Sequence, residues 1–241
     1  MLKVATYNIR KCVGLDWRRK PERIIGVLAE IAPQIVALQE ADRRFGERRG
    51  TLPAEELART AKLRIVELPG SGASHGWHGN TILVGEDVEV RRIERLALPF
   101  LEPRGALLAD LAIHGQPLRV VGLHLGLRHG SRMAQARAVI EALDQRADDA
   151  LEIVMGDLNQ WRGDRGGAEI ISRRLAPAPT SASFHTSRPI APIDRIFTSP
   201  ELGVAEHGVH RSPLALRASD HLPVWAKLTL PGRTPPRRAA R

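Results

Sequence analysis

The most informative part of this chain is a nine-residue stretch, LEIVMGDLN, at residues 151–159. Its first five residues are mostly large and apolar, whereas its last four include an acid and an amide, Asp157 and Asn159. A short apolar run rich in Val, Ile and Leu predicts a buried strand, here one that ends in polar residues. We therefore expect Asp157 to stand at the rim of a β-sheet.

Three further polar segments adjoin or interrupt apolar runs in the same way. They are Thr6-Tyr7-Asn8, Leu38-Gln39-Glu40 and Ser219-Asp220-His221. Strands that end in polar residues direct them to one rim of a sheet, so groups about 200 residues apart in sequence can share one cleft. Carboxylates, amides and an imidazole are the parts of a metal-assisted hydrolytic site. A polar turn that caps a strand accounts for any one segment, but it does not account for all four.

The length and composition of the chain allow this architecture. A chain of 241 residues buries a sizeable core as one domain, which we place at residues 1–230. The lone Cys12 excludes an intramolecular disulfide and fits a reducing compartment. No run approaches about 18 consecutive apolar residues, and no signal-peptide pattern is present. The sequence therefore predicts a cytoplasmic protein with no integral membrane segment, and it indicates no obligate protein partner.

The balance of charges favours an anionic partner, because the net charge is +9. Segment 231–241 is rich in Pro and Arg, contains no acid and has little to bury, so it predicts a disordered tail. Subtracting its four arginines from the net charge leaves +5 over the rest of the chain, a modest bias. The tail either contacts phosphates or lipids or serves as a solubilising end.

The order of apolar patterns predicts two sheets rich in antiparallel strands, with helices outside them. Helices are expected at 20–31, 53–61 and 131–146, the last with Ser131 as its N-cap. Strands are expected at 81–84, 88–98, 105–113 and 118–124, and strands resume at Ile193 and Val224. Gly115-Gln116-Pro117 predicts a hairpin turn between the last two of the four consecutive strands.

The polar segments suggest roles in hydrolysis. Mg²⁺ prefers oxygen ligands and is commonly held by one or two carboxylates. Glu40, with Asn8 nearby, meets this need and is the first choice as metal ligand. Attack on phosphorus requires an oriented, partly deprotonated water, which Asp157 with the amide of Asn159 could provide. Their i, i+2 spacing places both side chains on one side of an extended segment.

Negative charge that accumulates on phosphoryl oxygens requires cationic or donating groups. We expect these from His124, His221 and Arg104. Such a histidine needs a fixed and preferably protonated ring, which a neighbouring carboxylate achieves. A hydrogen-bonded core histidine is the alternative for His124. Asn80 is a candidate to line the phosphate pocket, with a turn role as its alternative. Trp161 either stacks on a base or a lipid glycerol region or packs against the sheet rim.

Eight short motifs, taken in order, resemble the endonuclease/exonuclease/phosphatase (DNase I-like) superfamily. They are TYNIR (6–10), LQE (38–40), HGN (78–80), EPRGA (102–106), LHL (123–125), GDLN (156–159), IDRIF (193–197) and SDHLPV (219–224). Single pieces such as LQE are weak, but the ordered set is highly specific. It covers essentially all of the chain that precedes the tail.

This resemblance implies a four-layered α/β sandwich of two mostly antiparallel β-sheets flanked by helices. It implies a divalent metal, usually Mg²⁺ with Mn²⁺ as an alternative, and hydrolysis of a phosphoester. It also implies that Asp194 pairs with His221 and that Asp220 lies close to the metal, as a direct or water-mediated ligand. We therefore expect a phosphodiesterase that uses a water activated by Asp157 at the metal.

Departures from the family pattern bear on the substrate. Some relatives carry an acid where this chain has Arg10. The arginine removes one possible metal ligand and adds a cation, so it favours a one-metal site and a direct contact between Arg10 and a substrate phosphate. Aromatic residues are only 4% and no long basic insertion is present, so a dedicated abasic-site endonuclease is not favoured. Nucleic acid and phospholipid-type diesters both stay open as substrates.

The alternative to an enzyme is a non-catalytic module that binds an anion, either nucleic acid or membrane, on the same fold. Its candidate contacts are Arg10, Arg43, Arg44, Arg48 and Arg49. Loss of an acid or of the imidazole from the polar segments would indicate such a module. Glu40, Asp157 and His221 are all present.

Overall fold

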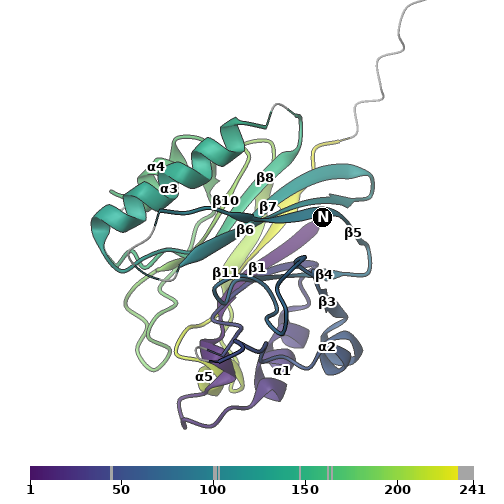
Figure 1. Ribbon diagram of the computed structural model, residues 1–241, viewed down its shortest axis with the longest axis vertical. Coiled ribbons are helices and arrows are strands. Elements are labelled where there is room, and N and C mark those ends of the chain that lie inside the picture. The colour runs from purple at the N-terminus through teal and green to yellow at the C-terminus, as the bar shows by residue number, and fades with distance from the viewer. Residues whose placement is uncertain are drawn as a thin grey trace, which may run out of the picture.

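The structure is a computed structural model that describes residues 1–43, 46–99, 102, 104–146, 148–161, 163 and 165–232. The described residues form two six-stranded sheets (Figure 1). The first sheet has the strand order β11-β12-β1-β2-β4-β3, and the second has the order β5-β6-β7-β8-β10-β9. Each sheet contains one parallel pair, β1 with β2 and β7 with β8, and its other pairs are antiparallel.

The strands of the first sheet are β1 (Leu2–Asn8), β2 (Ile35–Gln39), β3 (Leu63–Ile65), β4 (Thr81–Gly85), β11 (Gly203–Val209) and β12 (Val224–Thr229). Those of the second sheet are β5 (Val88–Leu96), β6 (Gly105–Ile113), β7 (Gln116–His124), β8 (Leu151–Asp157), β9 (Ala176–Pro177) and β10 (Asp194–Thr198). The helices are η1 (Arg10–Cys12), α1 (Pro21–Ile31), α2 (Ala54–Ala61), α3 (His129–Asp144), α4 (Gly167–Ser172) and α5 (Ala215–Ala218).

Three apolar clusters hold the layers together. The central cluster lies between the sheets and joins Val4 and Ile35 of the first sheet to residues such as Ile153 of the second. A second cluster packs α1 and α2 on the first sheet, and a third packs α3 and α4 on the second sheet. Figure 1 shows α3 and α4 at the top, α1 and α2 at the bottom and both sheets between them. The predicted four-layered α/β fold is confirmed.

The central strands are covered on both faces, which explains their continuous apolar runs. Along β1, Val4 belongs to the cluster between the sheets, whereas Ala5 belongs to the cluster under α1. All seven residues of β8 are buried. Burying one Val, Leu or Ile side chain contributes about 1.5–3 kcal/mol, so such strands are strongly fixed in register.

The two parallel pairs position the polar segments. In the first sheet Asn8 lies opposite Gln39, which places Glu40 just beyond the end of β2. In the second sheet His124 lies opposite Asp157, and Asp157 also lies opposite Asp194 of β10. Because the two strands of a parallel pair end at the same edge, each sheet gathers its polar residues at one rim.

The helix predicted at 20–31 is confirmed as α1, with Pro21 in its first turn. Pro is favoured there because backbone N–H groups in the first turn have no acceptor within the helix, so the lack of an N–H costs no hydrogen bond. The chain leaves the helix at Ala32, which adopts a left-handed conformation and donates its N–H to the Leu28 carbonyl. The helix predicted at 53–61 is confirmed as α2, one residue shorter at its start.

Some predicted local details are wrong. The hairpin between β6 and β7 turns at His114 and Gly115, with φ of 49° and 77°, so that Ile113 pairs with Gln116. A two-residue hairpin loop with both φ positive matches the twist of the strands, and it leaves Gln116 inside β7. Helix α3 begins at His129, so Ser131 lies in its first turn and is not the N-cap. The helix ends at Asp144 and does not reach Arg146.

Other boundaries and elements also differ from the sequence-based expectation. Strand β5 ends at Leu96, two residues before the predicted end. The sequence reading missed β3, β9, β11, α4 and α5. Strand β11 is mostly exposed or half-buried at the edge of its sheet, so it lacks the apolar run that marks the central strands.

Parts of the sequence reading fall outside the described residues. The predicted tail lies there from residue 233 onward, as do Arg44 and Pro103, the proline of the EPRGA motif. The prediction of one domain over residues 1–230 stays a prediction. Among the described residues, none of the helices has the length and apolar character that crossing a bilayer requires.

Candidate active site

The polar ends of the two sheets meet at Asp157. Asn8, at the end of β1, donates from Nδ2 to Asp157 Oδ2 at 3.0 Å, which joins residues 149 positions apart. The other carboxylate oxygen, Oδ1, accepts the backbone N–H of Asn159 at 2.9 Å. Asp157 is only 1% exposed. Hydrogen bonds from β1 and from the loop after β8 therefore fix this carboxylate in one orientation.

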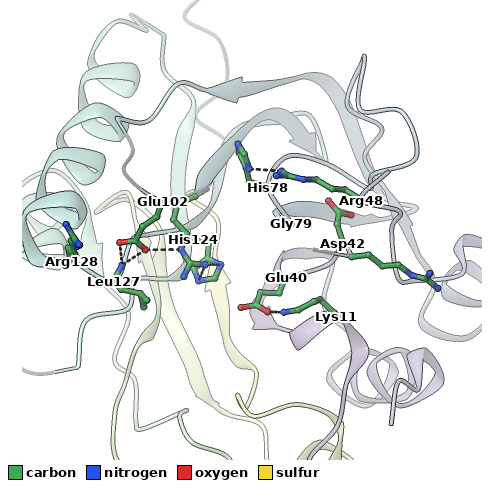
Figure 2. A pocket seen from close by; sticks show the side chains of 12 residues that line it. Lys11, Glu40, Asp42, Arg48, His78, Gly79, Glu102, His124, Leu127 and Arg128 are labelled. Atoms are coloured by element: carbon green, nitrogen blue, oxygen red, sulfur yellow. Dashed lines mark hydrogen bonds and ion pairs between the residues drawn. The ribbon is translucent and has the colours of Figure 1, made fainter. Parts of the chain in front are cut away.

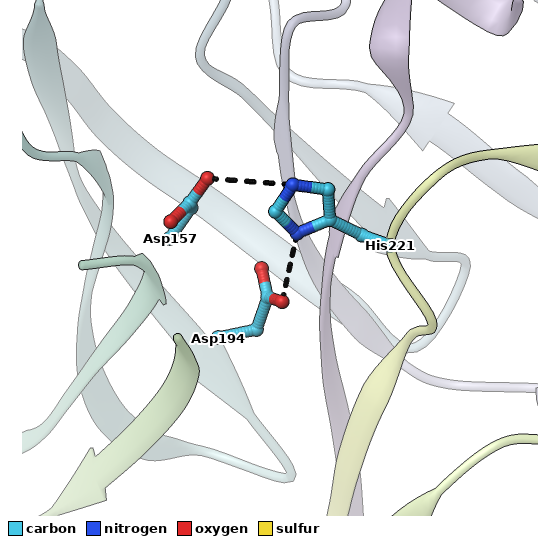
Figure 3. A group of neighbouring side chains, drawn as sticks. All are labelled: Asp157, Asp194 and His221. Atoms are coloured by element: carbon cyan, nitrogen blue, oxygen red, sulfur yellow. Dashed lines mark hydrogen bonds and ion pairs between the residues drawn. The ribbon is translucent and has the colours of Figure 1, made fainter. Parts of the chain in front are cut away.

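His221 lies between two carboxylates, as Figure 3 shows. Its Nδ1 lies 2.9 Å from Asp194 Oδ2, and its Nε2 lies 3.8 Å from Asp157 Oδ2. The Asp194 oxygen also accepts a hydrogen bond from the Ser183 hydroxyl at 2.6 Å. Asp194 thus pairs with His221, the partner that the family resemblance implied.

The electrostatics around His221 favour its protonated form. Burial by itself lowers the pKa of this imidazole, because it disfavours the charged ring. The charge and hydrogen bond of Asp194, together with the charges of Asp157 and Asp220, outweigh burial and raise the pKa to about 9. His221 is therefore a fixed cation at neutral pH.

His124 flanks Asp157 on another side and is electrostatically different. Its Nε2 lies 3.3 Å from Asp157 Oδ2, and Arg104 Nη1 lies 2.9 Å from the same ring nitrogen. Burial, together with the charges of Arg104, His221 and Lys11, outweighs the charge of Asp157 and lowers the pKa of His124 to about 3. His124, one of the three groups that the sequence suggested as cations or donors, is therefore neutral and has one N–H to donate.

Asn159 lies beside Asp157, but the geometry argued from its spacing is wrong. The extended segment ends at Asp157, and Asn159 has a left-handed φ of 50°. The backbone N–H of Asn159 contacts Asp157, whereas its side-chain amide donates to the Leu125 carbonyl at 2.8 Å. Asn tolerates this conformation because its short polar side chain bonds locally. The residue therefore holds the loop that follows Asp157.

Glu40 faces a large charged cavity beside this cluster. The cavity has a volume of about 730 Å³ and is lined by Lys11, Glu40, Asp42, Arg43, Arg48, His78, Gly79, Glu102, Arg104, His124, Leu127 and Arg128. Figure 2 shows Glu40 and Lys11 pointing toward each other. Lys11 forms an ion pair with Glu40, while Glu102 and Arg128 lie on one side and Arg48 and His78 on the other.

The remaining predicted site residues lie around this centre. Arg10 Nε lies 3.4 Å from Asp220 Oδ2, and the indole ring of Trp17 lies over the Arg10 guanidinium at 4.4 Å. Arg10 therefore forms an ion pair with Asp220. Asn80 is fully buried, and its amide donates to the carbonyls of Gly105 and Trp77 at 3.0 and 3.3 Å. Both amide hydrogens of Asn80 thus hold this turn, and its role in phosphate binding stays a prediction.

The sequence reading missed several residues of the site. Lys11 forms an ion pair with Glu40, and the Ser183 hydroxyl donates to Asp194. The ring of Phe184 lies 4.7 Å from the His221 ring. A second cation directly after Arg10 was the only local signal for Lys11. Ser183 and Phe184 stand in a segment read as loop, where no pattern marks a residue that reaches His221. Glu102 stands in a quoted motif, although no role was assigned to it.

The donor set of the site fits a hard divalent cation. The carboxylate of Glu40 and the carbonyl oxygen of Asn8 stand at the ends of neighbouring strands, and Asn8 Oδ1 accepts a backbone N–H from Arg10 at 3.1 Å. Both donors are oxygens, which suits Mg²⁺. Asp157, Asp194 and His221 also bring potential ligand atoms within 4.8 Å of one another, but the protonated ring of His221 has no free lone pair for a metal. The residues present therefore fit a metal site.

Comparison with known proteins agrees with this architecture. The family model described as the endonuclease/exonuclease/phosphatase family matches residues 5–221. A protein named YbhP from Escherichia coli strain K12, itself uncharacterized, is 28% identical over 168 residues. That match covers 64% of this chain and 64% of YbhP, so it spans just under two thirds of the curated relative.

Solved structures show the same fold. An endonuclease/exonuclease/phosphatase from Bacteroides vulgatus is 19% identical, with a TM-score of 0.74 over 95% of this chain and 98% of that one. An endonuclease/exonuclease/phosphatase from Beutenbergia cavernae is 24% identical, with a TM-score of 0.72 over 96% of this chain and 72% of that one. At these identities the likeness concerns the fold, whereas the family follows from the match over residues 5–221. This chain therefore belongs to the endonuclease/exonuclease/phosphatase family.

Proposed function

We propose that the protein is a Mg²⁺-dependent phosphoesterase that hydrolyses a phosphodiester. The observation that carries this proposal is the position of Asp157 between Asn8, His124 and His221, beside a cavity of about 730 Å³ that is rich in cations. A fixed carboxylate next to a charged imidazole pairs a proton acceptor with a group that stabilises negative charge.

In this proposal Asp157 accepts a proton from the attacking water. The hydrogen bonds from Asn8 and from the Asn159 backbone hold its two oxygens, so one face of the carboxylate is presented to the water. His221, kept cationic by Asp194, donates a hydrogen bond to a phosphoryl oxygen. Neutral His124 and the guanidinium of Arg104 supply further donors. Each donor stabilises charge that develops in the transition state.

Glu40 and Asn8 are the proposed metal ligands, with Asp220 as a direct or water-mediated third. When bound, Mg²⁺ supplies positive charge to the phosphoryl oxygens, with Mn²⁺ as the alternative ion. Lys11 forms an ion pair with Glu40 in the structure, and a cation held by Glu40 would take the place of that contact. Arg10 lies on Asp220 and adds positive charge on that side, which supports a site with one metal.

The cavity supports an anionic substrate. Its lining contains the cations Lys11, Arg43, Arg48, Arg104 and Arg128 against the carboxylates Glu40, Asp42 and Glu102. Such a cavity concentrates an anion at its mouth. Nucleic acid and phospholipid-type diesters both satisfy this requirement. A non-catalytic binding module does not require the contacts that Asp157 and Asp194 make with His221.

The test is hydrolysis of bis(p-nitrophenyl) phosphate and of p-nitrophenyl phosphate, each with Mg²⁺ or with chelator. We expect diester cleavage that requires Mg²⁺ and that falls at least about a hundredfold in His221→Ala, because that change removes a transition-state contact. His207→Ala is the matched control, since His207 is exposed on β11. Equal turnover in His221→Ala and wild type contradicts the role of His221, and faster monoester cleavage contradicts the preference for a diester.

A further inference from the structure

Large apolar side chains that face solvent are concentrated around the active site. Within the described part of the chain, six large hydrophobic residues are exposed: Met1, Trp17, Leu127, Trp161, Ile190 and Leu216. Leu127 lines the cavity, Trp17 contacts Arg10, and Trp161 and Ile190 contact Phe184, which contacts His221. Leu216 lies in α5, four residues before Asp220. Scattered apolar residues on a surface need no explanation, but a group at the mouth of a site indicates a binding surface.

Trp161 and Ile190 lie on the side of His221. The indole ring of Trp161 lies 5.3 Å from the ring of Phe184, which in turn lies 4.7 Å from His221. Ile190 donates its backbone N–H to the Phe184 carbonyl at 2.8 Å. Trp161 and Ile190 are 51% and 68% exposed, so both side chains face solvent beside the half-buried Phe184.

The other three residues lie in the cavity lining, next to Arg10 and in the helix that precedes Asp220. Leu127 lines the cavity. Trp17 covers Arg10, which lies on Asp220. Leu216 stands in α5, four residues before Asp220, and its neighbour Arg217 accepts the Leu15 N–H at its carbonyl, so α5 contacts the loop that carries Trp17. We call these five residues the apolar rim: Trp17, Leu127, Trp161, Ile190 and Leu216.

Exposed arginines accompany the apolar rim. Arg18, Arg128 and Arg217 directly follow Trp17, Leu127 and Leu216, and Arg188 precedes Ile190 by two positions. Asp16, the acid beside Trp17, is neutralised by two hydrogen bonds from Arg23 at 2.7 and 2.9 Å. Apolar side chains interleaved with arginines are the surface pattern that binds the headgroup and acyl boundary of an anionic bilayer.

We infer that the apolar rim docks on an anionic lipid bilayer and places the site against a phospholipid diester. Single-stranded nucleic acid explains this surface less well, because base stacking requires free aromatic faces. Leu127, Ile190 and Leu216 have no aromatic ring, and one face of Trp17 is covered by Arg10. Aliphatic side chains gain only from transfer into an apolar phase, which a bilayer provides.

The choice of substrate rests on the proposed hydrolysis, whereas the docking itself rests on the rim alone. The experiment measures co-sedimentation of the protein with vesicles of phosphatidylcholine, with or without about one third phosphatidylglycerol. We expect wild type to bind the anionic vesicles and the triple variant Trp161→Ser, Ile190→Ser, Leu216→Ser to bind at least about tenfold more weakly. The conservative triple variant Trp161→Phe, Ile190→Leu, Leu216→Met should bind as wild type does.

A second pair of variants tests the charges. Arg188→Glu with Arg217→Glu should also weaken binding to the anionic vesicles by at least about tenfold. Arg91→Glu with Arg92→Glu, the same change of charge on strand β5, should not, because β5 supplies none of the described residues that line the cavity. Hydrolysis of bis(p-nitrophenyl) phosphate should be retained in the double variant Ile190→Ser, Leu216→Ser, since neither position is a candidate for contact with this small diester.

Several outcomes overturn the docking inference. Wild type that binds no vesicles contradicts it, as does a serine variant that binds as tightly as wild type. Rim-dependent binding of a single-stranded oligonucleotide in place of vesicles assigns the surface to nucleic acid. Rim-dependent dimerisation in place of vesicle binding assigns it to a second copy of the chain. Vesicle binding without any diester hydrolysis leaves the docking intact and contradicts only the proposed function.

Discussion

At the scale of single residues, the site depends on a carboxylate that four neighbours hold in place. Asp157 contacts Asn8, His124 and the Asn159 N–H within 3.3 Å, with His221 slightly farther away. The two histidines differ in charge because the carboxylates of Asp194, Asp157 and Asp220 together outweigh burial at His221, whereas burial prevails at His124. Two residues of one type thus acquire different chemistry from their surroundings.

We predict that Asp157→Asn reduces turnover of a diester at least about a hundredfold, because the amide cannot accept a proton from water. The fold should persist, since Asn keeps an acceptor for the Asn8 amide. Steady-state kinetics and circular dichroism check both parts. Asp87→Asn, a change of charge at an exposed position, is the control. A rate within a few-fold of wild type in Asp157→Asn would exclude this residue as the base.

At the scale of elements, the parallel pair β7 and β8 positions Asp157, and this pair requires a close approach of backbones. A Cβ atom at Gly156 would lie 1.9 Å from the Leu123 carbonyl oxygen and 2.8 Å from its carbon. Both atoms belong to the backbone of the neighbouring strand, so they cannot move without disturbing the sheet. Gly156 therefore serves the strand pairing that places Asp157 opposite His124.

We predict that Gly156→Ala lowers the free energy of unfolding by about 3 kcal/mol or more, as overpacking against backbone does. Urea unfolding followed by circular dichroism measures it. Gly130→Ala is the matched control, because a Cβ at Gly130 in α3 meets nothing within 4 Å. That variant should gain up to about 1 kcal/mol from the lower backbone entropy of alanine. Equal stabilities for the two variants would refute the argument.

Another element-scale contact ties β6, β7 and the loop before β8. Arg119 on β7 is buried and donates to Asp110 at 2.8 Å and to both oxygens of Asp148 at 2.8 and 2.6 Å. These hydrogen bonds lower the pKa of Asp148 below its usual value. A carboxyl whose pKa is lower in the folded state stabilises the fold above its unfolded pKa of about 3.9.

We therefore predict that Asp148→Asn destabilises the protein at neutral pH by less than about 1 kcal/mol, since Asp148 is half exposed. The difference between variant and wild type should shrink as the pH falls below about 3.9, because acid removes the charge of Asp148 in wild type. Urea unfolding at neutral pH and in acid measures both differences. A difference that does not change with pH would show that the charge of Asp148 contributes nothing.

At the scale of the whole molecule, the site stands where the two sheets meet. Asn8 belongs to the first sheet and Asp157 to the second, and their hydrogen bond crosses the sandwich. The proposed metal ligands Glu40 and Asn8 end adjacent strands of the first sheet. A ligand that binds only the folded form stabilises the entire fold, because its binding is lost on unfolding.

We predict that Mg²⁺ raises the thermal unfolding midpoint of wild type and that Glu40→Gln abolishes most of this rise. At about a hundredfold excess of the ion over its Kd, the stabilisation should approach about 2.7 kcal/mol. Glu102→Gln is the matched control, since Glu102 lines the same cavity but accepts the Leu127 N–H. Scanning calorimetry with and without chelator measures the shift. An equal rise in both variants would contradict Glu40 as a ligand.

The sequence by itself predicted what depends on neighbouring residues. Pro21 and the apolar face of Ile24, Ile25, Leu28 and Ile31 mark α1, because helical periodicity is local. Short apolar runs predict the strands β1, β2 and β8, because this pattern is also local. The polar residues after these runs indicate the edge of the sheet at which the site lies. The motifs also indicated the four-layered fold and the pairing of Asp194 with His221.

Only the tertiary structure decided which of these groups meet and in which charge state. The bond from Asn8 to Asp157 joins residues 149 positions apart, and no local pattern encodes it. The opposite protonation of His124 and His221 depends on burial and on charges from distant segments, as does the ion pair of Lys11 with Glu40. The apolar rim likewise comes from five separate segments. These properties arise from packing of the whole chain, because solvent exclusion and Coulomb interactions act through space and not along the sequence.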